Sequence, residues 1–215
     1  YGWLIFHPTR QCFTSRSIFG QKANDRLYEA LHRLQRDGVR FTLVLIARGL
    51  PDEDCARKRI DALGLTPRVR WEPAMPRERL VRWYNMADVT VDQFYCGALG
   101  SLPLESMSCG TPVLTYMQTE SDTEPFMDPH DLYTELPPVL NASAPMEICE
   151  RLRASFTEAG SLRDRGERSR AWVERNAAGP VVARRYERLY HHLLCGADAT
   201  MPAGEVNGSR APTGN

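Results

Sequence analysis

The feature that most constrains the fold of this chain is an alternation between short apolar runs and amphipathic segments, repeated about five times. The apolar runs are 3–6, 41–47, 69–71, 89–91 and 112–115. The run 41–47 is almost continuously apolar, as expected for a central parallel strand covered on both faces. The alternation predicts a doubly wound, mostly parallel Rossmann-like α/β sheet with helices on both faces and right-handed crossovers.

The segments between these runs predict the helices. Asn24 is expected to cap the first, in which Leu27, Leu31 and Leu34 recur at helical spacing until Gly38. Further helices are predicted at 52–63, from 76 and from 101. A helical C-terminal extension is predicted from about 145, over 161–175 and from about 181. The segment 119–130 is a lid or a solvated connection.

Composition excludes several classes of protein. The 215 residues carry 27 basic and 27 acidic side chains, so net charge gives no reason to expect nucleic acid. The six cysteines form no CxxC pair, which argues against a zinc site or a disulfide framework. With no apolar run of membrane-spanning length and no secretory signal, a cytoplasmic location is predicted. The expected domain is 1–195, followed by a disordered tail at 196–215.

The stretch 92–114 carries the strongest functional signal. It reads as a turn with Gly97 and Gly100, a short helix from Ser101, a stop at Gly110 and a strand. The N–H groups at such a helix start favour an anion. Glu105, one turn further on, could accept two hydrogen bonds from a diol, and a phosphate beside a diol describes a nucleotide. On spacing alone, a tight turn with a solvated Glu105 is the stronger interpretation.

The predicted sheet favours the nucleotide-binding interpretation over the tight turn with a solvated Glu105. Ligands of such sheets bind beyond the carboxyl ends of the strands, at the point where the strand order reverses. Arg10 and Lys22 follow the first apolar run, whereas 97–105 follows a later one. We therefore expect both groups to lie at the same edge.

In this order the segments resemble the carboxy-terminal donor domain of GT-B glycosyltransferases of group 1 (family 4), from about 6 to 190. No single segment carries the resemblance, which depends on their joint order and spacing. The matching segments are Arg10, 22–27, 43–49, 84–89, 100–105, 109–113 and 170–174.

The resemblance implies roles for individual residues. Arg10 and Lys22 would clamp the diphosphate of a nucleotide-sugar, the backbone at Gly100 and Ser101 would hold it from the other side, and Glu105 would bind the ribose. As nucleoside diphosphate leaves, these cations would stabilise the developing charge. The donor is a substrate, and no cofactor or metal is expected. Further donor contacts are implied at Gly49, Trp71, Glu72, Pro73, Gly97, Ala98 and Leu99.

Two departures from the family pattern stand out. The Glu that the family usually carries eight positions before the ribose-binding Glu is Gly97 here. Asp92 or the backbone of 97–99 could take over its contact to the donor sugar. An insertion also separates Arg10 from Lys22, so Arg16 is an alternative partner for Lys22. Arg10 is favoured because it directly follows the strand.

The leading hypothesis is the donor-binding half of a retaining glycosyltransferase. Its expected partners are a nucleotide-sugar donor, an N-terminal acceptor domain, and an acceptor glycan or lipid, with peripheral membrane association of the full enzyme as an option. The isolated domain is predicted to be inactive. The alternative is an inactive nucleotide-sugar-binding or scaffold module of the same fold. A dehydrogenase is disfavoured because no GxGxxG follows the first strand.

Overall fold

The computed structural model describes residues 2–15, 17, 20–119, 135–158 and 160–195. The chain divides into two compact units, 1–177 and 178–215. Most of the predicted lid segment and the predicted tail at 196–215 lie outside the described residues. No helix within the described ranges is both long and apolar enough to cross a bilayer.

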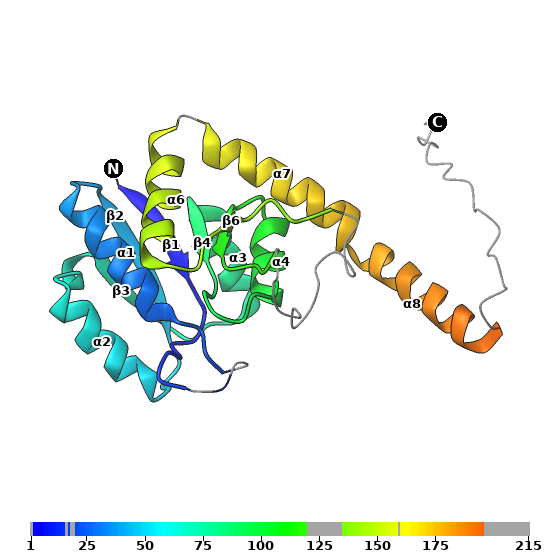
Figure 1. The fold of residues 1–215 in the computed structure, drawn as a ribbon, viewed down its shortest axis with the longest axis horizontal. Helices are drawn as coiled ribbons and strands as arrows, with labels where there is room; N and C mark the ends of the chain where they lie inside the picture. Colours follow the sequence, from blue (N-terminus) through cyan, green and yellow to red (C-terminus); the bar gives the residue numbers. More distant parts are fainter. Residues whose placement is uncertain (1, 16, 18–19, 120–134, 159, 196–215) are drawn as a thin grey trace, which may run out of the picture. The chain divides into compact units, whose positions relative to one another are not determined.

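The first unit contains a six-stranded sheet in which every pair of neighbours is parallel (Figure 1). The strand order is β3-β2-β1-β4-β5-β6, so the order reverses between β1 and β4. The strands are β1 (Trp3–His7), β2 (Phe41–Ala47), β3 (Val69–Pro73), β4 (Val89–Val91), β5 (Val113–Thr115) and β6 (Leu140–Asn141). The predicted doubly wound parallel sheet is confirmed.

Helices cover both faces of this sheet. On one face α1 (Asn24–Arg36), α2 (Asp52–Ala62) and α6 (Pro145–Thr157) pack in a single apolar cluster with residues of β1 and β2. On the other face lie α3 (Arg77–Met86), α4 (Ser101–Ser108) and α7 (Ser161–Asn176), which form two smaller clusters. A 3-10 turn, η1 (Thr66–Arg68), precedes β3. Successive residues of β1 divide between the faces, since Ile5 joins the first cluster and Phe6 the second.

A glycine allows α7 to approach α4 closely. A Cβ atom on Gly166 would lie 2.0 Å from the carbonyl oxygen of Gly110, the residue that ends α4 in a left-handed conformation. The backbone of α7 therefore rests directly against the turn between α4 and β5.

The start of α1 differs from the prediction. Ala23, with φ at 50°, is the cap residue of this helix, and Asn24 is its first helical residue. The Asn24 side chain accepts a hydrogen bond from the Cys12 N–H (2.9 Å) and donates one to His7 Nε2 (2.8 Å). The prediction that Asn24 caps α1 is wrong, because buried partners from another segment take up its amide.

The second unit contains α8 (Gly179–Cys195). Tyr186 and Tyr190 lie one turn apart on it, with ring centroids 6.1 Å from each other.

Candidate functional site

A cleft of about 480 Å³ lies beyond the carboxyl ends of β1, β2 and β4. It therefore spans the point where the strand order reverses, as expected for an open parallel sheet. Its walls come from the segments after these strands and from α3 and α4. The residues that line it are Pro8, Thr9, Arg10, Lys22, Arg48, Leu50, Leu80, Tyr84, Asp92, Gly100, Ser101, Leu102 and Glu105.

The structure brings five of the predicted site residues together in this cleft. Arg10 and Lys22 line it from the segment between β1 and α1. Gly100, Ser101 and Glu105 line it from the start of α4. Two cations, a helix N-terminus and a carboxylate thus share one cavity. Arg16, the alternative partner of Lys22, lies outside the described residues.

The backbone of Lys22 bridges the two sides of the cleft. Its N–H donates to the Cys12 carbonyl (2.6 Å), and its own carbonyl accepts from the Phe94 N–H (3.0 Å). The first contact joins the two ends of the inserted loop between β1 and α1. The second ties the start of α1 to the segment after β4. The backbone of Lys22 is therefore held by the segments that follow β1 and β4, the two strands that flank the switch point.

A buried histidine supports the segment that carries Arg10. His7, at the end of β1, is fully buried, and its Nδ1 lies 2.8 Å from the Val91 carbonyl. Its Nε2 accepts from Asn24, whose amide also donates to the Arg10 carbonyl (3.3 Å). Burial, with a smaller contribution from the charge of Lys22, lowers the pKa of His7 to about 4. His7 is thus a neutral structural residue.

A buried acid also lines the cleft beside the cations. Asp92 is 5% exposed, and its Oδ1 accepts the Thr9 hydroxyl at 2.7 Å. Burial raises the pKa of Asp92, while the Thr9 hydrogen bond and the charge of Lys22 act in the opposite direction. This carboxyl group therefore lies close to the charge that would hold a diphosphate.

The carboxylate of Glu105 already has two partners, both from α3. Arg77 Nη2 lies 3.1 Å from Oε1, and the Tyr84 hydroxyl donates to Oε2 at 3.3 Å. Burial and the negative charge of Glu105 raise the pKa of Tyr84, so this hydroxyl keeps its proton at neutral pH. The Glu105 side chain is about one quarter exposed, toward the cleft.

The start of α4 is suited to an anion. Gly100 is the cap residue in an extended conformation, and no described side chain caps the helix. Backbone N–H groups in the first turn are therefore available to a ligand in the cleft, and the helix dipole adds partial positive charge there.

Other residues predicted to contact the donor do not line the cleft. Trp71 lies under the Arg57 guanidinium (4.1 Å to the ring centroid) and lines a separate cavity of about 250 Å³. Glu72 forms an ion pair with Arg70. Pro73 ends the edge strand β3 and is exposed. Gly49 lies between two lining residues without lining the cleft itself. Donor contacts by these residues stay predictions.

Gly97 belongs to a loop organised by Gln93. The Gln93 side chain accepts the N–H groups of Tyr95 and Cys96 (both 2.7 Å) and donates to the carbonyls of Ala98 and Tyr116. Gly97 has a φ of 74°. A Cβ atom there would lie 3.0 Å from the Gln118 Cβ and 3.2 Å from the Tyr116 ring. A Glu at this position, as the family usually carries, would need a left-handed backbone and a shift of Gln118 or Tyr116 by a few tenths of an ångström.

Leu99, the last predicted contact of that loop, packs with the apolar cluster of α4 and α7. Neither Gly97, Ala98 nor Leu99 lines the cleft. Their predicted contacts to a donor sugar also stay predictions.

Sequence reasoning missed several lining residues, and Arg48 and Tyr84 are the most informative of them. Arg48 lies directly after β2, and its guanidinium donates to the Pro8 carbonyl (3.3 Å). The position-after-strand argument that selected Arg10 applies equally to Arg48 and could have found it. Tyr84 lies in the matching segment 84–89, for which the sequence predicts no donor contact. Its ring is buried, but its hydroxyl reaches Glu105, a contact that no local pattern predicts.

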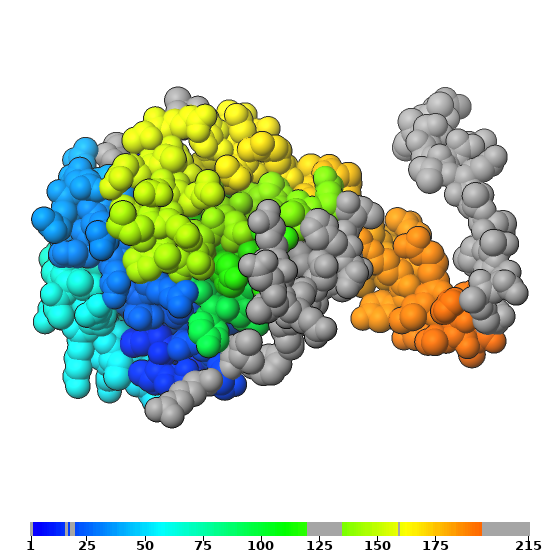
Figure 2. Space-filling view, viewed as in Figure 1, coloured from blue at the N-terminus to red at the C-terminus, as the bar shows by residue number. Residues whose placement is uncertain are grey.

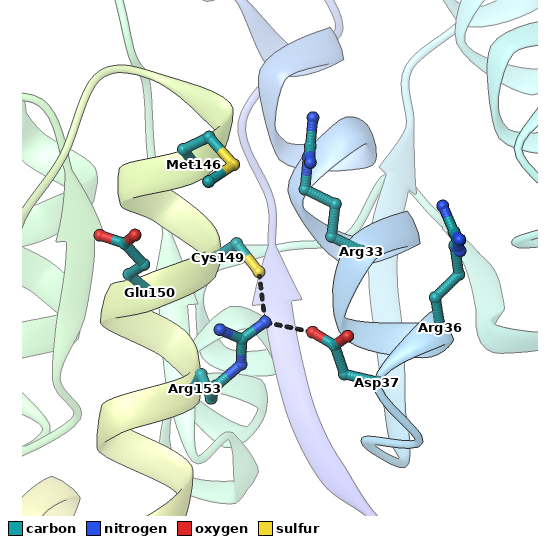
Figure 3. Close-up of a pocket in the computed structure, with 7 residues that line it drawn as sticks. All are labelled: Arg33, Arg36, Asp37, Met146, Cys149, Glu150 and Arg153. Carbon is teal, nitrogen blue, oxygen red and sulfur yellow. Dashed lines mark hydrogen bonds and ion pairs between the residues drawn. The ribbon is translucent and has the colours of Figure 1, made fainter.

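A second cavity, of about 340 Å³, lies between α1 and α6 (Figure 3). The two helices lie side by side on the face of the molecule that Figure 2 shows. The Arg153 guanidinium lies between the Cys149 sulfur (3.5 Å) and the Asp37 carboxylate, with Arg33 and Arg36 nearby. The C-terminal part of α1 runs toward the edge of the sheet opposite the cleft, so this cavity is separate from the candidate site. Within the described ranges, no group of three or more His, Cys, Asp or Glu side chains could hold a metal ion.

Comparison with solved structures defines the class of fold. A glycosyltransferase from Rickettsia africae ESF-5 is 13% identical, with a TM-score of 0.69 over 91% of this chain and 49% of that one. The C-terminal domain of the group 1 glycosyl transferase LpcC from Francisella tularensis is 16% identical, with a TM-score of 0.58 over 80% of this chain and 84% of that domain. At these identities the likeness concerns the fold, which is the Rossmann-like half of a GT-B protein.

The sequence comparison defines the family. The profile of the family described as "Glycosyl transferases group 1" matches residues 4–124. The chain belongs to this family. It is 38% identical over 98 residues to a D-inositol 3-phosphate glycosyltransferase of Mycolicibacterium smegmatis, and 32% identical over 95 residues to one of Frankia alni. These alignments cover 43% and 41% of this chain but only 21% and 23% of the relatives.

Proposed function

We propose that the chain is the donor-binding half of a retaining glycosyltransferase, which transfers a sugar from a nucleotide-diphosphate-sugar to an acceptor glycan, lipid or small molecule. The observation that carries the proposal is the convergence of Arg10, Lys22, the start of α4 and Glu105 on one cleft. Membership of the group 1 family supports it.

The chemistry of the cleft fits the departure of a nucleoside diphosphate. Breaking the bond between sugar and phosphate builds negative charge on the diphosphate. Arg10 can meet two phosphate oxygens with its planar fork, and Lys22 acts as a point charge. The N–H groups of the first turn of α4 add donors that need no reorganisation. Because this charge grows toward the transition state, the same groups would both bind the donor and speed its cleavage.

The full reaction would require a further domain. In GT-B enzymes the reaction takes place between two domains, and the second carries the acceptor site. We therefore expect the 215-residue chain to bind donor without turnover. We assign 1–195 to the donor domain and expect turnover only when an acceptor domain is supplied.

The test is calorimetric titration of the chain with UDP, GDP, ADP and their sugar conjugates. Binding of at least one is expected, and Lys22→Ala and Glu105→Ala should each weaken it by roughly 1.5–3 kcal/mol, the contribution of a hydrogen bond to a charged group. Lys58→Ala and Glu78→Ala are matched controls, since both side chains are exposed and neither lines the cleft. Absence of binding, or equal losses in the controls, would refute the assignment.

The alternative, an inactive nucleotide-sugar-binding module, is favoured by one observation. The carboxylate that usually contacts the donor sugar is absent at Gly97, and the crowded, left-handed backbone there disfavours a longer side chain. Donor binding with full affinity but no turnover in the presence of an acceptor domain would support this alternative.

A further inference from the structure

Tyr84 is fixed before any ligand arrives. It is 1% exposed, and its ring packs edge-on against Phe6 with centroids 5.6 Å apart. Its carbonyl accepts the Thr111 hydroxyl at 2.7 Å. The ring is thus held by β1 and by the segment after α4, and its hydroxyl donates to Glu105 Oε2. The rigid tyrosine therefore restricts the orientation of this flexible carboxylate.

Arg77, on the same face of α3, differs in exposure. Its side chain is 73% exposed, and its guanidinium lies 3.1 Å from Glu105 Oε1. Exposed ion pairs of this kind contribute little to stability, because water screens the charges and the long side chain loses freedom. Oε2 of Glu105 thus has a fixed, buried donor in Tyr84. Oε1 has an exposed donor in Arg77, which a ligand can replace.

We propose that α3 sets the selectivity of the cleft for ribose over 2′-deoxyribose, with Tyr84 orienting Glu105 and Arg77 leaving Oε1 when a ribose hydroxyl arrives. The inference rests on the proposed function and extends it to a residue that acts by positioning Glu105. A carboxylate receives both hydroxyls of a cis diol only when its plane faces them. Tyr84 imposes that orientation in advance, so less side-chain freedom is lost on binding. The 3.3 Å contact leaves Oε2 a free lone pair for the second hydroxyl.

The test compares the affinity of a nucleoside diphosphate with that of its 2′-deoxy analogue, using UDP and dUDP or the ADP and GDP pairs. The parent chain should prefer the ribonucleotide by at least about tenfold, the effect of one hydrogen bond to a charged group. Tyr84→Phe should reduce this ratio about threefold or more, and it should weaken the deoxynucleotide, which keeps only the 3′-hydroxyl, by a smaller factor. Tyr28→Phe is the control, because Tyr28 is equally buried and its hydroxyl contacts Gln11.

Arg77→Ala provides a second variant at an exposed position that should fold normally. It should tighten ribonucleotide binding by up to about fivefold, since no ion pair then has to open. Arg82→Ala, an exposed arginine of α3 outside the cleft lining, should change nothing.

The outcomes separate this inference from the function on which it rests. An unchanged ratio in Tyr84→Phe, or an equal loss for both nucleotides, would overturn the inference and leave donor binding intact. Ribonucleotide binding that weakens in Arg77→Ala would likewise overturn the exchange of Arg77. A parent chain that binds neither nucleotide would overturn the proposed function and this inference together.

Discussion

Substitution of Gly97 tests whether the loop after β4 can accommodate a side chain such as the Glu that the family usually carries there. Because φ is 74°, any other residue here would destabilise the folded state by about 1–2 kcal/mol through the left-handed conformation. Its Cβ would also meet Gln118 at 3.0 Å and the Tyr116 ring at 3.2 Å. Crowding of this kind in a packed region adds about 1–3 kcal/mol. We therefore expect Gly97→Ala to lower the free energy of unfolding by about 2–5 kcal/mol.

The matched control is Gly38→Ala. Gly38 has a similar φ of 79°, but a Cβ atom there would find no atom within 4 Å. It should lose only the conformational part, about 1–2 kcal/mol. With a slope of about 3 kcal/mol per molar urea, a loss of 3 kcal/mol in Gly97→Ala moves the unfolding midpoint by about 1 M. Equal midpoints for the two variants would refute the steric argument.

The same reasoning predicts the result of reintroducing the family residue. Gly97→Glu should be at least as destabilised as Gly97→Ala, and it should gain no affinity for a nucleotide-sugar over the free nucleotide. A gain in calorimetric affinity for the sugar conjugate alone would show that the loop can reopen.

Two further predictions concern the core. The pKa of His7 is lowered from 6.5 to about 4 in the folded chain. Between these pH values the unfolded chain binds a proton that the folded chain does not. The free energy of unfolding should therefore fall by up to about 3 kcal/mol as the pH drops from 6.5 through 4. Urea unfolding at pH 7 and 4.5 should show this loss in the parent and a smaller one in His7→Gln; equal losses would contradict it. Gly166→Ala should lower the free energy of unfolding by about 3 kcal/mol or more, since its Cβ would overlap the Gly110 carbonyl. In the control Gly179→Ala the new Cβ meets nothing within 4 Å, so stability should hardly change. Similar thermal midpoints for the two variants would argue against a rigid contact at Gly166.

The order of strands and helices was predictable because it depends on local periodicity. The run 41–47 is a buried central strand, and Gly110 ends α4 as expected. The meeting of Arg10 and Lys22 with Glu105 was also predictable, since parallel strands bring their carboxyl ends to one edge. These inferences need only the pattern of the chain and the topology of such sheets.

The contacts between side chains from distant segments were not predictable in this way. Asn24 has the residue type of a helix cap, but its side-chain amide donates a hydrogen bond to the buried His7 ring instead of capping α1. The hydroxyl of Tyr84 reaches Glu105 only because α3 and α4 pack side by side. Tertiary packing settles both, so neither leaves a signal in local sequence.

The hydrogen bond between the Lys22 N–H and the Cys12 carbonyl has a consequence for the history of this protein. It joins the two ends of the segment 13–21 before the chain enters α1. Residues can thus be gained or lost in that segment while the distance between the two predicted phosphate-binding cations stays constant. A change of length in this segment should therefore leave the candidate site intact.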